Sequence, residues 1–214
     1  MEEIKKEPIT VLFILLNILI FLVVDFTGGS ENTAHMIECG AAYPPLILEN
    51  GEIYRLFTCM FLHFGIYHIA NNMLVLFVLG QRLEPVVGKI KFILIYLLGG
   101  LGGNIFSFIM EMKSADYAVS AGASGAVFAV MGAMLYVVIR NHGRIQDISV
   151  RQMMIMAGFS ILVSLIFCLM SANVPCNFTC LPYVPHWVIR IGILADIPCA
   201  KAASTKRSSA STPM

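Results

Sequence analysis

Charged residues are scarce in this chain. Asp, Glu, Lys and Arg make up 13% of its 214 residues, about half of the roughly 25% found in soluble domains. Hydrophobic residues make up 58% and the mean hydropathy is +0.81, which is more apolar surface than a soluble domain of this size can bury. Intrinsic disorder is excluded as well, because disordered chains are poor in apolar residues and rich in charge. The composition therefore predicts a polytopic membrane protein.

Signals for metal, nucleic acid and secretion are also missing. The six cysteines include no pair of CxxC motifs, and the close pair Cys176 and Cys180 fits either small hydrophobic residues or a disulfide in an exported loop. A net charge of +1 gives no general attraction to nucleic acid. The first apolar stretch has no Ala-x-Ala-like site after it, so we expect no cleaved signal peptide. We expect no metal, no cofactor and no nucleic-acid partner.

Five apolar segments have the length of membrane-spanning helices, which need about 20 residues to cross about 30 Å of hydrocarbon. They cover residues 9–26, 64–80, 92–110, 120–139 and 153–172. The expected fold is an all-α polytopic membrane protein, with residues 1–172 as its membrane domain.

Basic residues predict the orientation of these spans. The N-terminal tail and two of the loops lie on the same side of the predicted membrane, and they contain Lys5, Lys6, Arg82, Lys89, Lys91, Arg140, Arg144 and Arg151. The positive-inside rule then places the N-terminus in the cytoplasm. The external segment 25–52 carries five acids and no base. It is too long for a simple connection, so we expect it to fold back on the membrane.

Residues 173–214 break the pattern of the preceding spans. They begin with a proline-containing stretch, and the apolar run 187–195 is short and has Arg190 in its middle. Arginine at mid-bilayer costs about 2.5–3.5 kcal/mol. A sixth span, which would return the basic tail to the cytoplasm, is therefore absent or degenerate. We expect this segment to be irregular or disordered.

A first polar cluster lies in the second span. His68 and Asn72 are four residues apart, so they share one face of a helix. Both side chains can donate a hydrogen bond while neutral, which suits stabilisation of an oxyanion in a site of low dielectric. The alternative is that they join two helices, as Asn and His do in other membrane bundles.

A second cluster surrounds Ser124 at the outer end of the fourth span. Small residues recur there at helical spacing, which lets a neighbouring backbone come close. The sequence Gly-x-Ser-Gly leaves the Ser124 hydroxyl unobstructed and accessible to a base, as a nucleophile requires. The alternative is tight packing alone, with Ser124 bonded back to its own helix.

Five motifs in this order and spacing resemble the rhomboid family of intramembrane serine proteases. They are Tyr54-Arg55-Leu-Phe-Thr58, the His-x4-His-x3-Asn pattern from His63 to Asn72, Glu84 with Gly88, Gly102-Gly103-Asn104, and Gly122-Ala-Ser124-Gly125 with Gly132. Each motif alone is weak, but five in register are specific. The resemblance covers residues 8 to about 172.

The resemblance implies a serine–histidine dyad in which Ser124 is the nucleophile. His68, Asn72 and the Ser124 backbone N–H would form the oxyanion hole. Structural support would come from Arg55, His63, Glu84, Gly122 and Gly125. The implied substrates are single-span membrane proteins, cut within the lipid bilayer near its outer leaflet. The implied location is a cell membrane, as an integral multi-pass protein.

The general base is where the sequence departs from the family pattern. The family places a histidine, followed by glycines, on a sixth helix. This chain offers His186, followed by Trp187-Val-Ile-Arg190, which is bulky and charged. One hypothesis is a disrupted reading frame between Ala172 and Pro185. Trp187 is encoded by TGG and the codon of Val188 begins with G, so a reading frame shifted by one base contains GGG, a glycine codon, at this point. In the same shifted frame, the junction of the Pro185 and His186 codons can encode histidine.

Two other functions stay open on the sequence alone. A rhomboid-fold protein without a base would bind membrane clients without cleaving them. A small transporter is the third possibility, against which the sequence shows no internal repeat and no ionisable residue within the third to fifth predicted spans. His35 and His142 match no family motif, and we expect both to be solvated surface residues.

Overall fold

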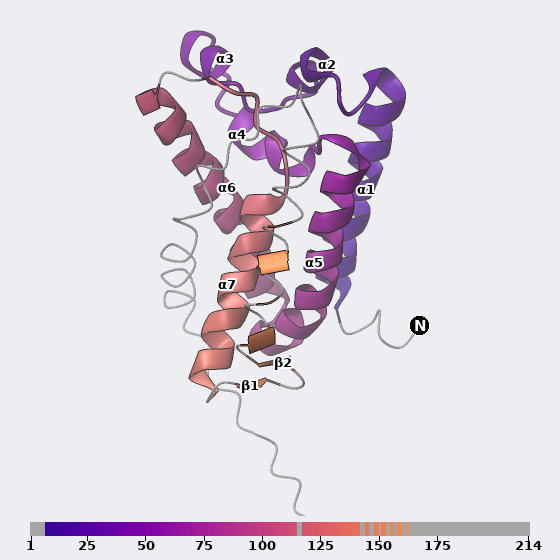
Figure 1. Ribbon diagram of the computed structural model, residues 1–214, viewed down its shortest axis with the longest axis vertical. Helices are drawn as coiled ribbons and strands as arrows, with labels where there is room; N and C mark the ends of the chain where they lie inside the picture. Colours follow the sequence, from indigo (N-terminus) through magenta and orange to yellow (C-terminus); the bar gives the residue numbers. More distant parts are fainter. Residues whose placement is uncertain are drawn as a thin grey trace, which may run out of the picture.

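The computed structural model describes residues 7–114, 117–141, 144–145, 148–149, 151–152, 155, 158–159 and 162. Four long helices form a bundle in which successive helices run in opposite directions (Figure 1). They are α1 (Pro8–Gly28), α5 (Gly65–Val87), α6 (Lys89–Ser114) and α7 (Ser124–Arg140). The bundle is therefore helical, as the sequence predicts.

Short elements lie at the two ends of the bundle (Figure 1). The connection between α1 and α5, residues 29–64, contains α2 (Thr33–Glu38), α3 (Pro44–Glu49), α4 (Arg55–Thr58) and the 3-10 turn η2 (Cys59–Phe61). At the opposite end, β1 (Arg144–Ile145) pairs antiparallel with β2 (Ile148–Ser149).

The first four predicted spans correspond to the four long helices. By length and composition α1 and α6 could each cross a membrane. Residues Arg55–Phe61, which form α4 and η2, meet α5 at an angle of 87°. If these segments count as one broken span, a third crossing is possible. Helix α7 is apolar but has 17 residues, which is about 25 Å of helix. The predicted fifth span, 153–172, and the segment 173–214 lie almost wholly outside the described residues.

Helix α6 is longer than its predicted span, which ended at Met110. It continues to Ser114 and includes Glu111, which is 3% exposed. The predicted span itself contains no charged residue, but the helix that includes it carries a buried carboxylate. The sequence had suggested that the carboxylate lies beyond the apolar run, whereas the helix continues for one more turn.

Close backbone contact joins α6 to α7, the helix on which Ser124 lies. A Cβ added at Gly99 would collide with the Ala129 side chain. A Cβ added at Gly125 would lie 3.5 Å from the Gly100 carbonyl oxygen. Glycine and alanine at such contacts allow two helices to approach closely in a membrane. Helix α7 is consequently buried along most of its length.

Polar side chains tie α1 to its neighbours at two levels. At the start of α1, the Glu84 carboxylate of α5 accepts hydrogen bonds from the backbone N–H of Ile9 at 3.0 Å and of Thr10 at 2.8 Å. These bonds satisfy N–H groups that a helix start leaves open. In mid-helix, the Asn17 amide donates to the Tyr96 hydroxyl at 3.1 Å. Both contacts hold α1 in register with the bundle.

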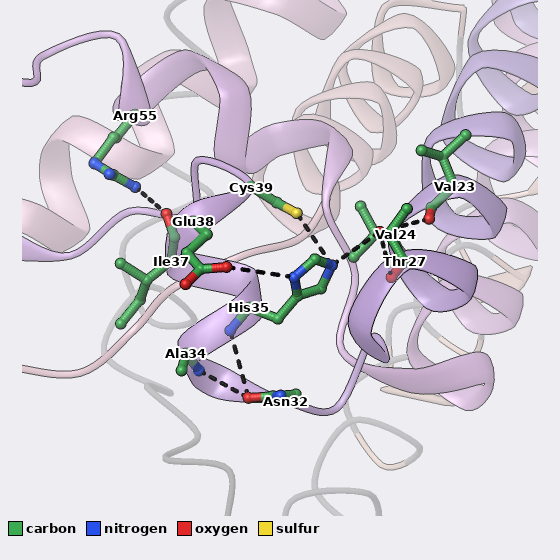
Figure 2. A network of polar contacts seen from close by, with 10 residues as sticks. All are labelled: Val23, Val24, Thr27, Asn32, Ala34, His35, Ile37, Glu38, Cys39 and Arg55. Carbon is green, nitrogen blue, oxygen red and sulfur yellow. Dashed lines mark hydrogen bonds and ion pairs between the residues drawn. The ribbon is translucent and has the colours of Figure 1, made fainter.

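Arg55 and His35 hold the α1–α5 connection in place. The Arg55 guanidinium donates to the carbonyls of Ile37, at 2.5 Å, and Ala41, at 3.1 Å. The Nε2 atom of His35 lies 3.0 Å from the Thr27 hydroxyl and 3.4 Å from the Cys39 thiol (Figure 2). His35 is half-buried, so the expectation of a solvated surface residue was wrong for it. His142 lies outside the described residues.

Candidate active site

Ser124 is the first residue of α7 and is half-buried. Helix α7 begins below the level of α2 and α3 in Figure 1, so its first turn is recessed beneath the α1–α5 connection. The backbone N–H groups in the first turn of a helix point away from its body and carry partial positive charge. A hydroxyl at this position therefore has hydrogen-bond donors of its own backbone close by.

The backbone of the segment before Ser124, residues 117–123, makes four hydrogen bonds to the α1–α5 connection. Ser120 and Ala42 exchange two backbone hydrogen bonds, of 2.8 and 2.9 Å. The Gly122 N–H donates to the Cys59 carbonyl at 2.9 Å, and the Ala123 N–H donates to His63 Nε2 at 3.3 Å. We call residues 117–123 the serine segment. Its position, and hence that of Ser124, is determined by the α1–α5 connection.

Gly122 is required at its position for two reasons. Its φ is +142°, a conformation that residues with a side chain rarely adopt. A Cβ there would also lie 2.7 Å from His68 Cε1 and 2.9 Å from its Nε2. The glycine thus lets the His68 ring lie directly against the backbone two residues before Ser124.

Two histidines of the His-x4-His motif meet at this point. His63, 1% exposed, precedes α5, and His68 lies in its first turns. Their rings are edge to face with centroids 5.3 Å apart. Because His63 accepts through Nε2, its ring proton lies on Nδ1 if the ring is neutral. His63 therefore supports the serine segment, while His68 lies beside Gly122.

Asn72 lies one turn beyond His68 on the same helix and is 3% exposed. Its amide nitrogen has no hydrogen-bond partner among the residues that the structure describes. A buried donor in this condition is costly and rare in folded proteins. The side chain thus keeps a donor in reserve, as a group that binds a developing negative charge must.

The remaining predicted supports occupy distinct places. Arg55, 5% exposed, binds the connection, and Glu84, 1% exposed, binds the start of α1 at the far end of the bundle. Gly125 contributes to the close α6–α7 contact. The structure thus brings His63, His68 and Gly122 together next to Ser124, whereas Glu84 lies away from the site.

The candidate base, His186, lies outside the described residues. Within the described ranges, no three His, Cys, Asp or Glu side chains are placed to hold a metal ion. The described part contains the predicted nucleophile, Ser124, and the predicted oxyanion donors His68 and Asn72.

Sequence reasoning missed a polar group behind the serine segment. The Glu111 carboxylate of α6 accepts from the Ser107 hydroxyl at 3.1 Å and from the Ser120 hydroxyl at 3.3 Å. The spacing of Ser107 and Glu111, four residues apart at the end of an apolar helix, was the available signal.

Comparisons with known proteins find similar chains that are named as rhomboid proteins. The chain is 44% identical over 136 residues to rhomboid protease GluP of Bacillus subtilis. The aligned region covers 64% of this chain and 26% of that protein. It is 48% identical over 101 residues to RHOMBOID-like protein 2 of Arabidopsis thaliana, covering 47% and 30% of the two chains. A third relative, the mitochondrial RHOMBOID-like protein 6 of Arabidopsis thaliana, is 40% identical over 116 residues, covering 54% and 36%.

This chain spans about a quarter to a third of the length of these relatives. The family model described as the Rhomboid domain matches residues 50–184, a range that contains the serine segment, α5, α6 and α7. With its motifs in register and its helices packed around Ser124, the chain is an integral membrane protein that belongs to the rhomboid family.

Proposed function

We propose that this chain carries the site of an intramembrane serine endopeptidase, in which Ser124 is the nucleophile. The observation that carries the proposal is Asn72, a buried amide whose nitrogen has no partner in the described structure, on the same helix face as His68. His68 lies against Gly122, two residues before α7 begins, and Asn72 lies one turn further along α5. A donor kept free in a buried site is what an oxyanion hole needs.

The chemistry follows from these positions. The Ser124 hydroxyl attacks the carbonyl carbon of a peptide bond while a base takes its proton. The carbonyl oxygen becomes an oxyanion, which accepts hydrogen bonds from His68, Asn72 and the Ser124 backbone N–H. The base then gives the proton to the leaving amine, and water hydrolyses the acyl-enzyme. The candidate base in the sequence as written is His186. A histidine on an intact sixth helix would take its place if the frame were restored.

The substrates that fit this site are single-span membrane proteins. Helix α7, at about 25 Å, is shorter than the roughly 30 Å hydrocarbon layer, and its first residue is Ser124. A serine at the start of such a short helix can lie below the membrane surface, where a transmembrane segment can reach it. Five spans, with a degenerate sixth, and residues 1–172 as the membrane domain complete the proposal.

The N-terminus is cytoplasmic in this proposal, and the site faces the outer side of a cell membrane. Single-cysteine variants labelled with a membrane-impermeant maleimide test the orientation. Positions in the α1–α5 connection should label from outside, and position 144 should not. Labelling of position 144 from outside would contradict the positive-inside argument.

The decisive experiment is labelling by a fluorophosphonate probe, which reacts only with an activated serine. Trp187 and Arg190 make a poor context for a helix that packs closely on α7, so we expect no detectable labelling of the chain as written. Replacing residues 173–214 with a family-like helix that opens with His-x-Gly should restore labelling. Ser124→Ala in the repaired chain should abolish it again.

The outcomes separate the proposal from its rival. Labelling of the unmodified chain that disappears in His186→Ala would show that His186 is a working base. Failure of the repaired chain to label would favour the alternative function, a rhomboid-fold protein that binds membrane clients without cleaving them. The atypical sequence after His186 is the observation that favours this alternative.

A further inference from the structure

Glu111 is a buried carboxylate for which the proposed chemistry has no use. It lies in the last turn of α6 and is 3% exposed. Ionisable residues within membrane helices are costly and are rare unless they serve a purpose. Its described hydrogen bonds come from the hydroxyls of Ser107 and Ser120, at 3.1 and 3.3 Å, and both reach the same atom, Oε1.

The two serines differ in what they can control. Ser107 is one turn earlier on α6 itself, so its bond to Glu111 stays within one helix. Ser120 belongs to the serine segment and lies four residues before Ser124. Its backbone already pairs with Ala42. The Ser120 hydroxyl therefore adds a side-chain bond from α6 to a segment whose backbone is held by the α1–α5 connection.

Helix α6 also holds the other side of the site. The Asn104 amide donates to the Leu56 carbonyl at 2.9 Å and to the Cys59 sulfur at 3.1 Å. Cys59 in turn accepts from the Gly122 N–H through its carbonyl. The serine segment is therefore clamped between η2 and α6, with Cys59 on one side and Glu111 on the other.

We propose that Glu111 is a positioning residue for Ser124, which it holds in place through the Ser120 hydroxyl. The inference rests on the proposed function, because it assigns a purpose to the position of Ser124. Both serine hydroxyls donate to Oε1 of Glu111, and an amide oxygen can also accept two hydrogen bonds. Glutamine should therefore replace Glu111, whereas leucine, of similar size, should not.

The first measurement reports on the serine segment without needing activity. In the full chain with Cys59 as its sole cysteine, the rate of alkylation by N-ethylmaleimide is measured well below the melting temperature. Cys59 is 1% exposed, and the serine segment lies against it. Glu111→Leu and Ser120→Ala should raise the rate about tenfold, the upper range for the loss of one hydrogen bond, while Glu111→Gln and Ser107→Ala stay within about twofold.

Rescue and coupling distinguish positioning from general stabilisation. The double variant Glu111→Leu/Ser120→Ala should alkylate no faster than either single variant, because both changes remove the same bond. An equal rise in Ser107→Ala and Ser120→Ala, or in Glu111→Gln and Glu111→Leu, would overturn the proposal.

The second measurement links the segment to Ser124. This measurement uses the chain in which residues 173–214 are replaced. Glu111→Leu should lower the maximal rate at which fluorophosphonate labels Ser124, and should leave unchanged the probe concentration that gives half of that rate. An unchanged maximal rate would overturn the positioning role. If the repaired parent chain itself does not label, the proposed function fails, and the Cys59 rates still decide whether Glu111 holds the serine segment.

Discussion

Two buried asparagines in this bundle behave differently. Asn17 of α1 is fully buried, and its amide nitrogen donates to the Phe13 carbonyl at 2.7 Å and to the Tyr96 hydroxyl at 3.1 Å. Asn72 of α5 is nearly as buried, but its nitrogen has no partner in the described residues. The first joins helices, as polar residues in membranes do. Burial alone therefore does not distinguish the two amides, whereas the hydrogen bonding of their nitrogen atoms does.

The largest expected effect is the exchange of Asn72. In the repaired chain, Asn72→Ala should lower kcat by about 10²–10³ and change KM little, because an oxyanion donor acts in the transition state. Asn17→Ala is the matched control. It should leave kcat unchanged at a temperature well below Tm, and should destabilise the fold by about 1–3 kcal/mol because it leaves Tyr96 without this partner.

Steady-state kinetics and thermal unfolding in detergent provide both readouts for the two asparagines. An unchanged kcat in Asn72→Ala would mean that His68 and Asn72 only join helices, as Asn17 does. Both amides would then have a purely structural role.

A second prediction contrasts two glycines near the site. Gly122→Ala forces a side chain into a positive-φ position beside His68, and should cost about 1–3 kcal/mol of strain. Gly102→Ala in α6 meets nothing within 4 Å, and should be neutral or slightly stabilising because alanine favours helix. Thermal unfolding of both variants measures the difference. Equal Tm values would contradict the close approach of His68 to the serine segment.

The smallest expected effect concerns Glu52 in the α1–α5 connection. The Asn50 amide and the Arg55 guanidinium hold the pKa of Glu52 below its ordinary value of 4.5. A lowered carboxyl pKa contributes stability above the unfolded value, and this contribution is lost as pH falls through the lowered pKa. The connection should therefore become more susceptible to pepsin as pH falls below about 4.5.

Glu52→Gln is the control for this acid dependence. It should make the pepsin susceptibility of the connection less dependent on pH, because the titrating group is gone, while Glu49→Gln on the exposed end of α3 should leave the dependence unchanged. Identical pH profiles for Glu52→Gln and the parent chain would show that other groups control the loosening.

Much of this arrangement could be read from the sequence because it is local. Apolar length predicted five spans, four of which correspond to the long helices of the described residues. The spacing of His68 and Asn72 placed them on one face of α5. Glycine at positions 122 and 125 predicted close backbone contact at Ser124. The half-buried network of His35 was missed, since its partners Thr27 and Cys39 meet it only after the connection folds. Glu111 was missed because an apolar run does not reveal how far its helix continues.

The sequence by itself determined the membrane class, the helix order and the identity of the candidate nucleophile, because hydropathy and helical spacing act over short distances along the chain. Tertiary structure alone decided which buried amide keeps a donor in reserve, and which carboxylate holds the serine segment. These outcomes depend on contacts between residues far apart in sequence, such as Asn17 with Tyr96 and Gly122 with Cys59. Whether a polar group in an apolar bundle finds a partner depends on how the helices pack, and no local pattern contains that information.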